Sequence, residues 1–340
     1  MGEGRLESGD LLDARGCLAQ SGYAFSQVKT YRRAAVKPKL RIKEWDYYSV
    51  VDGDYAVALT VADNSYMSLA SVSVIDFKHI KYITKSKIGF MSLGKLGMPS
   101  SCTEGNVRYD KGGVKISFDI DETGKRTLKA EYKKFDGNKT FKCEFSLAPA
   151  TGDNITVAIP FGKKRRFYYN TKINCLRCSG WFSVGDERHE FKNAYAGLDW
   201  GRGVWTYKNT WYWSSLSCET DDGKTLGLNL GYGFGKPTES ENVVFYDGKA
   251  NKLDNITFDI PYTQGKIDYL KPWKIADNEN RLELMFYPMI DRKDRMNVGV
   301  LATDQHQVFG KFYGKVVLDD GTIINVADKT GFAEKVVNRW

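Results

Sequence analysis

The side chains best suited to chemistry are concentrated between residues 197 and 213. Three glycines frame an acid, an indole and a base there, in the order Gly197, Asp199, Trp200, Gly201, Arg202 and Gly203. Glycine permits unusual dihedral angles and a close approach of the backbone to a ligand. Arg202 close to Asp199 would keep this carboxylate ionised. We therefore expect a loop that carries an acid–base site, and the alternative is a buried ion pair that only fixes the shape of the loop.

The two segments that follow are expected to contribute an aromatic surface and an amide side chain to the site. Trp211 and Trp213 share one face of a predicted strand, Trp211–Ser217, because side chains alternate along a strand. Asn229 lies between two glycines on the return strand, Thr225–Tyr232. If the two faces meet inside a barrel, they enclose a cavity with flat apolar walls and one amide. The alternative is that the two indoles fill the interior.

Four residues are the expected catalytic groups, and eight more are expected to bind a substrate. The catalytic set comprises Asp199, Arg202, Glu241 and Glu334. The binding set comprises Trp45, Trp200, Tyr207, Trp211, Trp213, Asn229, Asn242 and Gln307. Carboxylates supply acid–base chemistry, whereas guanidinium and amide groups orient polar atoms or stabilise developing charge. A lone glutamate usually faces water, so an exposed position is the alternative for Glu241 and Glu334.

The sequence lacks the motifs that hold a nucleotide, a metal or an activated serine. It has no G-x-S-x-G, no phosphate-binding loop and no G-x-G-x-x-G that opens a helix. Cys175 and Cys178 have C-x-x-C spacing without a second pair, and residues three apart on a strand point to opposite faces. His306 lies beside Gln307, but a lone histidine is usually a hydrogen-bonded surface group. We expect no cofactor and no metal.

Alternating apolar residues and turn signals predict strands throughout the chain. Asp-Gly pairs, which are typical of hairpins, occur at residues 52–53, 136–137, 222–223, 247–248 and 320–321. The predicted strands are Trp45–Val51, Tyr55–Val61, Tyr66–Phe77, Trp211–Ser217, Thr225–Tyr232, Val243–Tyr246, Val308–Leu318 and Thr322–Val326. A short helix is predicted over Gly331–Val337. Meanders of short antiparallel strands close most readily into barrels, because closure removes exposed edges.

Length and composition predict two all-β domains with a few short helices. A chain of 340 residues suits two domains of ordinary size. Proline, glycine and a basic run surround residues 150–166, so the expected boundary separates residues 1–155 from residues 156–340. The irregular segment at the start contributes four leucines that are expected to pack on the first barrel, Leu6, Leu11, Leu12 and Leu18.

Charge and hydropathy argue against nucleic-acid and membrane-spanning functions. The net charge of +8 is mild for this length, and the single basic run, Lys163–Arg166, is interpreted as a solvated loop because a nucleic-acid surface needs a longer stripe. No signal-peptide pattern is present, and no stretch approaches the roughly 18 apolar residues of a membrane span. We expect a cytoplasmic protein with reduced cysteines and a small-molecule ligand, and the oligomeric state is open.

Five stretches of the sequence resemble the signature of one bacterial family, known as domain of unknown function 2804. They are Leu198–Trp205, Asn209–Trp213, Leu228–Phe234, Glu241–Asn242 and Gly331–Glu334. The resemblance extends over nearly the full length of the chain, and its motifs are long. The family label implies no activity.

A second stretch, Glu44-Trp45-Asp46-Tyr47-Tyr48, is similar to the start of proteins with two lipocalin-like domains. That group includes carotenoid hydratases and AttH-type proteins. The similarity implies two calycin-type β-barrels in tandem, with a site in a barrel or at their junction. The hydratases carry a His-Asp-His-Asn-aromatic-Gly motif where this chain has residues 196–201, Ala-Gly-Leu-Asp-Trp-Gly. Both histidines and the acid of that motif are absent, so the hydration reaction is not transferred by this similarity.

Three functions fit these features. The first is a cofactor-independent lyase, isomerase or hydrolase that acts on an amphipathic or sugar-containing molecule, because aromatic faces stabilise cations and two carboxylates can flank a glycosidic bond. The second is a non-catalytic carrier of a hydrophobic ligand. The third is a structural or interaction protein in which Asp199, Arg202 and Glu241 satisfy one another. Fold similarity alone does not decide among them.

Overall fold

The computed structural model describes residues 4–236, 239–299 and 301–339. The chain is all-β and separates into two units, Leu6–Trp205 and a second unit that comprises Met1–Arg5 and Thr206–Trp340. This division differs from the expected boundary between residues 155 and 156. The strands that follow residue 155 pair with strands of the first unit, which holds the segment up to Trp205 in that unit.

Twelve strands form one antiparallel sheet in the first unit. They are β2 (Gly22–Ala24), β4 (Ile42–Asp52), β5 (Tyr55–Asp63), β6 (Met67–Asp76), β7 (Lys81–Phe90), β8 (Val107–Lys111), β9 (Val114–Ile120), β10 (Arg126–Asp136), β11 (Lys139–Leu147), β12 (Ile155–Pro160), β13 (Phe167–Val184) and β14 (Glu187–Val204). Their order is β7-β6-β5-β4-β14-β13-β11-β10-β9-β8, and β12 pairs with both β13 and β2. The short strands β1 (Gly9–Asp10) and β3 (Lys29–Thr30) pair with each other, and the two 3-10 turns are η1 (Arg33–Ala35) and η2 (Lys39–Arg41).

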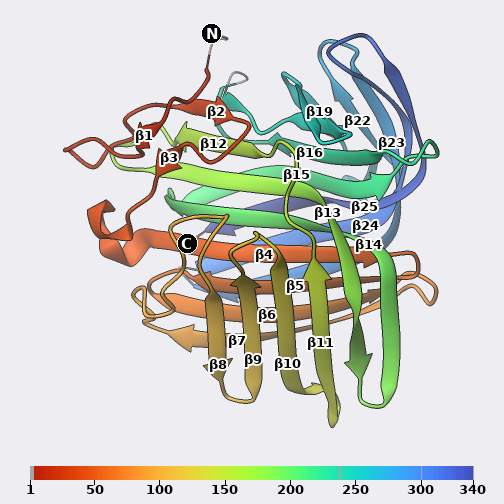
Figure 1. Ribbon diagram of the computed structural model, residues 1–340, viewed down its shortest axis with the longest axis horizontal. Coiled ribbons are helices and arrows are strands. Elements are labelled where there is room, and N and C mark those ends of the chain that lie inside the picture. Colours follow the sequence, from red (N-terminus) through yellow and green to blue (C-terminus); the bar gives the residue numbers. More distant parts are fainter. Residues whose placement is uncertain (1–3, 237–238, 300, 340) are drawn as a thin grey trace. The chain divides into compact units, whose positions relative to one another are not determined.

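The first sheet folds over on itself. Figure 1 shows β4–β7 running across the unit and β8–β11 running nearly perpendicular to them, while the long strands β13 and β14 pass from one set to the other. The apolar core lies between the two sets, where the rings of Tyr48 and Phe118 meet with centroids 4.8 Å apart. The four leucines of the initial segment bury in this core or pack against it, as predicted.

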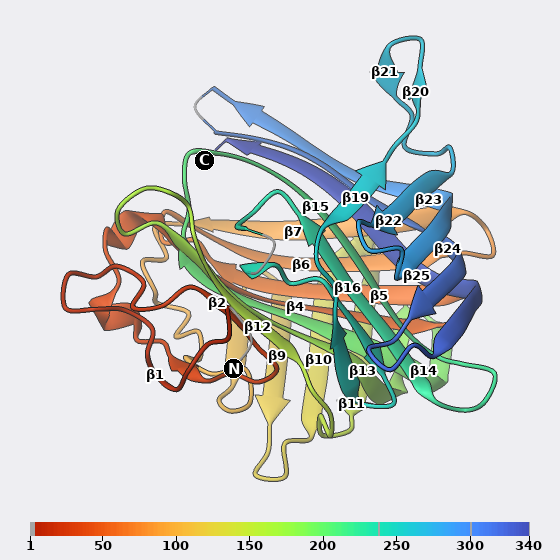
Figure 2. The same cartoon turned by 90° about the horizontal axis from the view of Figure 1, so that it is seen from above.

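Nine strands form the antiparallel sheet of the second unit. In spatial order they are β18 (Lys249–Lys252), β17 (Val243–Tyr246), β16 (Thr225–Tyr232), β15 (Lys208–Glu219), β25 (Ile323–Arg339), β24 (Leu301–Val317), β23 (Leu282–Val298), β22 (Trp273–Asp277) and β19 (Ile256–Asp259). A separate small hairpin joins β20 (Tyr262–Thr263) to β21 (Lys266–Ile267). Figure 2 shows the long strands β23, β24 and β25 twisting strongly along their length. One face of the sheet packs into a second apolar core.

The predicted strands are largely confirmed, and one predicted element is wrong. Thr225–Tyr232 and Val243–Tyr246 match β16 and β17 to the residue, and Asp52 and Gly53 lie at the turn between β4 and β5. The helix expected over Gly331–Val337 is instead part of β25, which pairs with β15 on one side and β24 on the other. Ladder hydrogen bonds on both edges outweigh the weak helical propensity of this short segment.

The cysteines form no disulfide bonds, and the described residues contain neither a metal-binding cluster nor a membrane-spanning helix. All six cysteines are free thiols. Among the described residues, no group of three or more His, Cys, Asp or Glu side chains is arranged to hold a metal ion. Within the same ranges, no helix has the length and apolar character needed to cross a bilayer.

The glycine-rich part of β14 makes room for an indole from the neighbouring strand. Gly201 is opposite Trp45 of β4, and a Cβ atom added to Gly201 would lie 2.0 Å from Trp45 Cζ2. The indole stacks on Tyr168, with ring centroids 6.2 Å apart, and meets Trp205 edge-on at 5.7 Å. Gly201 therefore serves the packing of an aromatic cluster.

We predict that Gly201→Ala lowers the free energy of unfolding by about 1–3 kcal/mol, the usual cost of forcing extra volume into a packed site. Urea denaturation of the two proteins measures the difference. In a Trp45→Leu background, where the indole is absent, the same substitution is expected to cost much less. An equal cost in both backgrounds would contradict the steric explanation.

Candidate functional site

The expected site residues are divided between the two units. Four belong to the first unit, Trp45, Asp199, Trp200 and Arg202, and the other eight belong to the second, Tyr207, Trp211, Trp213, Asn229, Glu241, Asn242, Gln307 and Glu334. Of the second set, Tyr207 is 41% exposed.

Asp199 and Arg202 do not pair with each other. The segment expected to be a loop lies in strand β14, where residues three apart point to opposite faces. The Oδ1 atom of Asp199 accepts a hydrogen bond from Asn170 Nδ2 at 2.6 Å and lies 3.0 Å from Lys172 Nζ. Lys172 therefore balances the charge of Asp199, and the expected pairing with Arg202 is wrong.

Arg202 is a fully engaged guanidinium in the interior of the first unit. Its side chain is 0% exposed. The Nη1 atom donates to the carbonyls of Trp45 and Gly201, both at 2.8 Å. The Nη2 atom donates to Asp46 Oδ1 at 3.0 Å and to the Pro99 carbonyl at 2.8 Å, and Nε donates to the same carbonyl at 3.2 Å. Because all three nitrogens donate to protein atoms, this geometry suits a structural anchor.

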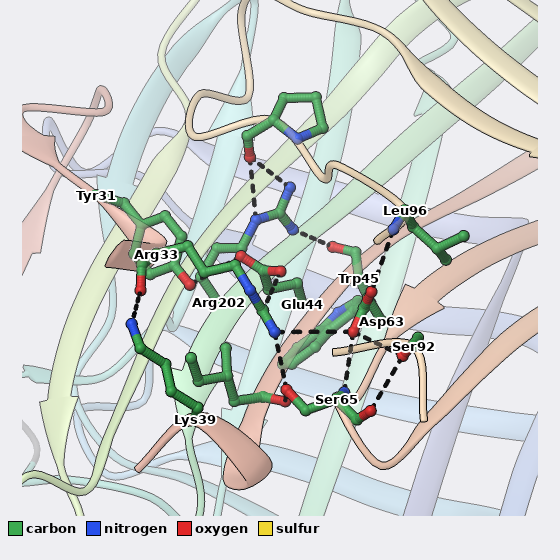
Figure 3. Close-up of polar contacts among 12 residues, drawn as sticks. Tyr31, Arg33, Lys39, Glu44, Trp45, Asp63, Ser65, Ser92, Leu96 and Arg202 are labelled. Carbon is green, nitrogen blue, oxygen red and sulfur yellow. Dashed lines mark hydrogen bonds and ion pairs between the residues drawn. The ribbon is translucent and has the colours of Figure 1, made fainter. Parts of the chain in front are cut away.

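A network of buried charges adjoins Arg202, as Figure 3 shows. Glu44 is 0% exposed and accepts hydrogen bonds from Tyr31 Oη at 2.8 Å and from Arg33 Nη1. The Nη2 atom of Arg33 donates to Ser65 Oγ at 2.9 Å and lies 3.9 Å from Asp63 Oδ1. The N-terminal segment, β4 and β5 are thereby joined through charge-assisted hydrogen bonds.

Burial governs the protonation of this network. Removal from water raises the pKa of Glu44, although the charges of Arg202 and Arg33 act in the opposite direction. Burial also raises the pKa of Asp46, against the lowering effect of Arg202. The pKa of Tyr31 lies well above its ordinary value because of burial and the neighbouring Glu44. Burial thus disfavours the charged forms of Glu44 and Asp46, and the neighbouring arginines favour them.

Two expected binding residues of this unit have different surroundings. Trp200 is 0% exposed, and the rings of Tyr31 and Tyr169 meet it edge-on. The guanidinium carbon of Arg202 lies 4.1 Å from the centroid of the Trp200 ring. Trp200 is thus a core residue, whereas Trp45 belongs to the aromatic cluster on the other face of the sheet.

The second unit brings most of the expected residues onto one face of its sheet. Glu334 of β25 is directly opposite Trp213 of β15 on one side and Gln307 of β24 on the other. Glu334 is 4% exposed. Its Oε1 atom accepts from Trp211 Nε1 at 3.0 Å, and its Oε2 atom accepts from Gln307 Nε2 at 3.1 Å. Arg292 of β23 extends this row by donating to Gln307 Oε1 at 2.6 Å.

The same face continues toward β16 and the segment after it. Asn229 accepts from Trp213 Nε1 at 2.8 Å and donates to the Glu241 carbonyl at 2.8 Å. Gly231 is opposite Trp213, and a Cβ atom on Gly231 would lie 2.6 Å from Glu241 Oε1. The carboxyl group of Glu241 therefore occupies the position of a side chain in this row. Asn242 holds the turn by accepting from the Gly231 N–H at 2.6 Å.

A histidine cluster on the opposite face was not expected as a site. His306 Nδ1 lies 2.8 Å from Asp291 Oδ2, and His306 Nε2 lies 3.4 Å from Asp304 Oδ1. Arg295 donates two hydrogen bonds to Asp304 and lowers the pKa of that carboxyl. The Tyr269 ring stacks on the imidazole at 3.7 Å. No local feature of the sequence signals this cluster, because the register of the β23–β24 hairpin brings these residues together.

A groove of about 810 Å³ lies where strands β15, β23, β24 and β25 end. Its lining includes Asn209, Asn338, Thr303 and Met296, which occupy one row across the four strands. Asn338 is 4% exposed, and its Oδ1 atom has no hydrogen-bond partner among the described residues. Because side chains alternate, Asn338 and Glu334 project from the same face of β25.

Lys252 lies near the Glu241 end of this face. Its Nζ atom donates to Ser240 Oγ at 2.8 Å and to the Leu253 carbonyl at 2.5 Å. Burial lowers the pKa of Lys252 to about 8, although the charges of Asp254 and Glu241 act in the opposite direction.

Comparison with known proteins gives one family and a shared fold. A family model described as domain of unknown function 2804 matches residues 3–340. No curated protein matches significantly. An AttH-like protein from Nitrosomonas europaea is similar with a TM-score of 0.54 and 14% identity, over 90% of this chain and 94% of that one. Kievitone hydratase from Nectria haematococca is similar with a TM-score of 0.51 and 12% identity, over 98% of each chain. At these identities the likeness is one of fold.

We predict that Arg202→Met lowers the free energy of unfolding by about 3–5 kcal/mol, because the substitution leaves buried carboxylates without their cation. Chemical denaturation followed by tryptophan fluorescence measures the loss. The matched control is Arg188→Met on the same strand, where the arginine is 51% exposed and is expected to matter little. Equal effects of the two substitutions would contradict the anchor role of Arg202.

Lys252 predicts a dependence of stability on pH. Its folded pKa of about 8 lies below the ordinary value of 10.5, so between these limits the unfolded chain binds more protons. The contribution of Lys252 to stability should therefore be complete above pH 10.5 and be lost as the pH falls through 8. Urea denaturation of the wild type and of Lys252→Met, compared at several pH values, isolates this effect. An unchanged difference between the two proteins would refute the prediction.

Proposed function

This chain belongs to the family described as domain of unknown function 2804, and we propose that it is a cofactor-independent acid–base enzyme of the lyase or hydratase type. The observation that carries the proposal is the buried carboxyl group of Glu334, which accepts hydrogen bonds from the indole of Trp211 and the amide of Gln307. A carboxyl group in such surroundings suits proton transfer to a bound small molecule. The substrate class we propose is an amphipathic molecule with a carbon–carbon double bond.

Each residue on this face has a proposed role. Glu334 donates its proton to one alkene carbon, and the adjacent carbon becomes cationic. The rings of Trp211 and Trp213 stabilise that cation through their faces. A water molecule adds its oxygen to the cation, and the proton that it releases returns to Glu334, so the reaction is a net hydration. Gln307 and Asn229 orient the polar end of the substrate.

The fold supports this class of reaction. Kievitone hydratase, by its name a hydratase, is similar to this chain over 98% of its length. We also propose that each of the two units is a lipocalin-like barrel, in the tandem arrangement that the sequence resemblance implies. The groove beside Asn209 and Asn338 is the proposed entry to the Glu334 face, because both residues lie on that face. For Arg202 we propose the structural role that its hydrogen bonds describe.

Glycoside hydrolysis is the second candidate, and one observation favours it. Glu241 and Glu334 lie on either side of Trp213 in a single row of the sheet. Adjacent strands are about 4.8 Å apart, so the backbone positions of Gly231 and Glu334 on either side of β15 are separated by about 10 Å, and the Glu241 carboxyl group lies beside Gly231. Glycosidases use two carboxyl groups that lie on either side of the scissile bond, and Glu241 and Glu334 are the proposed pair.

The test is hydration of isoprenoid alcohols of increasing chain length in water enriched in oxygen-18, followed by mass spectrometry. We expect a product that gains one labelled water molecule. Glu334→Gln should reduce its formation by at least about a hundredfold, the lower range of general acid catalysis. Asp199→Asn, assayed in parallel, shows whether the carboxyl group of the first unit is also required.

The control is Glu283→Gln, an exposed glutamate of the same sheet with 59% of its side chain accessible. This variant should retain full activity. Full activity in Glu334→Gln would refute the proposed acid. Binding of the alcohols without any product would assign the protein to the carriers, and release of sugar from aryl glycosides would favour the second candidate.

A further inference from the structure

Two basic segments that are distant in the sequence line one pocket of the first unit. One segment is Lys37–Lys39, which follows η1 and ends on the first residue of η2, and the other is Lys164–Arg166, between β12 and β13. The pocket has a volume of about 570 Å³. Five of its six lining residues are cationic and the sixth is Pro38, so no carboxylate contributes to the wall. The basic run that the sequence suggested to be a solvated loop is therefore half of a pocket.

The protein holds two of these cations in place through backbone carbonyls. Lys39 Nζ donates to the Arg33 carbonyl at 3.0 Å and to the Ala34 carbonyl at 2.7 Å. Arg165 Nε donates to the Arg15 carbonyl at 2.8 Å. These bonds leave one ammonium proton of Lys39 and the terminal nitrogens of Arg165 for a ligand. Fixed side chains lose less entropy when a ligand binds.

The positive charge of the pocket is not balanced by the protein. In the ranges that the structure describes, none of the five cations forms an ion pair with a carboxylate. Other basic residues of the same unit do so, such as Arg108 with Asp119 and Arg188 with Glu190. Burial lowers the pKa of Lys39, and the charges of Arg33 and Lys37 lower it further. A bound anion would remove this repulsion between like charges.

We propose that this pocket binds the phosphate group of a ligand. Arginine side chains match phosphate oxygens with pairs of hydrogen bonds, and lysines add compact point charges. The volume is in the range of small-molecule sites, which is roughly 300–1,000 Å³, so a phosphate with an organic group attached fits. Such a group could belong to a soluble phosphorylated compound or to a lipid headgroup.

Titration calorimetry of the full-length protein with inorganic pyrophosphate tests the proposal. We expect saturable binding that weakens as salt is added. The double variant Arg165→Gln/Arg166→Gln should raise the Kd at least about tenfold, because hydrogen bonds to charged groups are the strong ones. The matched control is Arg108→Gln/Arg188→Gln, which removes the same charge from exposed arginines of the same unit and should leave the Kd unchanged.

Sedimentation with phosphatidylcholine vesicles, with and without phosphatidic acid, identifies the source of the phosphate. Pyrophosphate binding that the pocket variant alone weakens supports a soluble ligand. Binding to phosphatidic acid vesicles that the same variant alone weakens supports a lipid headgroup. If both variants lose binding equally, or if neither probe binds the wild type, the proposal is overturned.

Discussion

A guanidinium group without access to water is the constraint on which the first unit depends. Arg202 is held by carbonyls of β4, β14 and the segment at Pro99, and by the carboxylate of Asp46. Removing any of these partners would leave a buried charge or donor unsatisfied, which costs far more than an ordinary contact. The chain must therefore bring these segments together in one arrangement. The N-terminal segment must also take one position, because Arg33 of this segment donates a hydrogen bond to the buried carboxylate of Glu44.

In the second unit, buried polar groups on one face of the sheet are likewise satisfied by hydrogen bonds, and indole and amide groups supply many of the donors. Trp211, Gln307 and Asn229 each use an N–H or amide to satisfy a buried neighbour on one face of the sheet. The opposite face of these strands contributes Leu228, Val308 and Ala333 to the apolar core, and nearer the β23–β24 turn it carries the cluster around His306. Glu334 is the carboxyl group at the centre of the polar face, and its placement follows from strand pairing on both sides of β25. The two units thus differ in kind, since one buries compensated charges and the other presents a row of hydrogen-bonding groups.

Local patterns predicted the strands well but not what the strands bring together. Hairpins with Asp-Gly turns and the run Thr225–Tyr232 were evident because alternation and turn chemistry are local. The segment around Asp199 was misjudged, because its glycines suggested a loop, whereas Gly201 makes space for Trp45 and Gly203 lies against the backbone of Phe167, both on neighbouring strands. The shared face of Trp213 and Glu334 depends on register between distant strands. The partners of Arg202 and His306 depend on it as well, and the sequence carries no local signal for them.

The most direct test of the central claim is a crystal structure of the protein grown with an isoprenoid alcohol. We expect the ligand to lie on the Glu334 face of the second sheet, with its double bond near the carboxyl group and its chain against Trp211 or Trp213. A ligand bound elsewhere, with Glu334 still enclosed by Trp211 and Gln307, would contradict the central claim. In that case the row of polar groups would be a structural feature, like the network around Arg202.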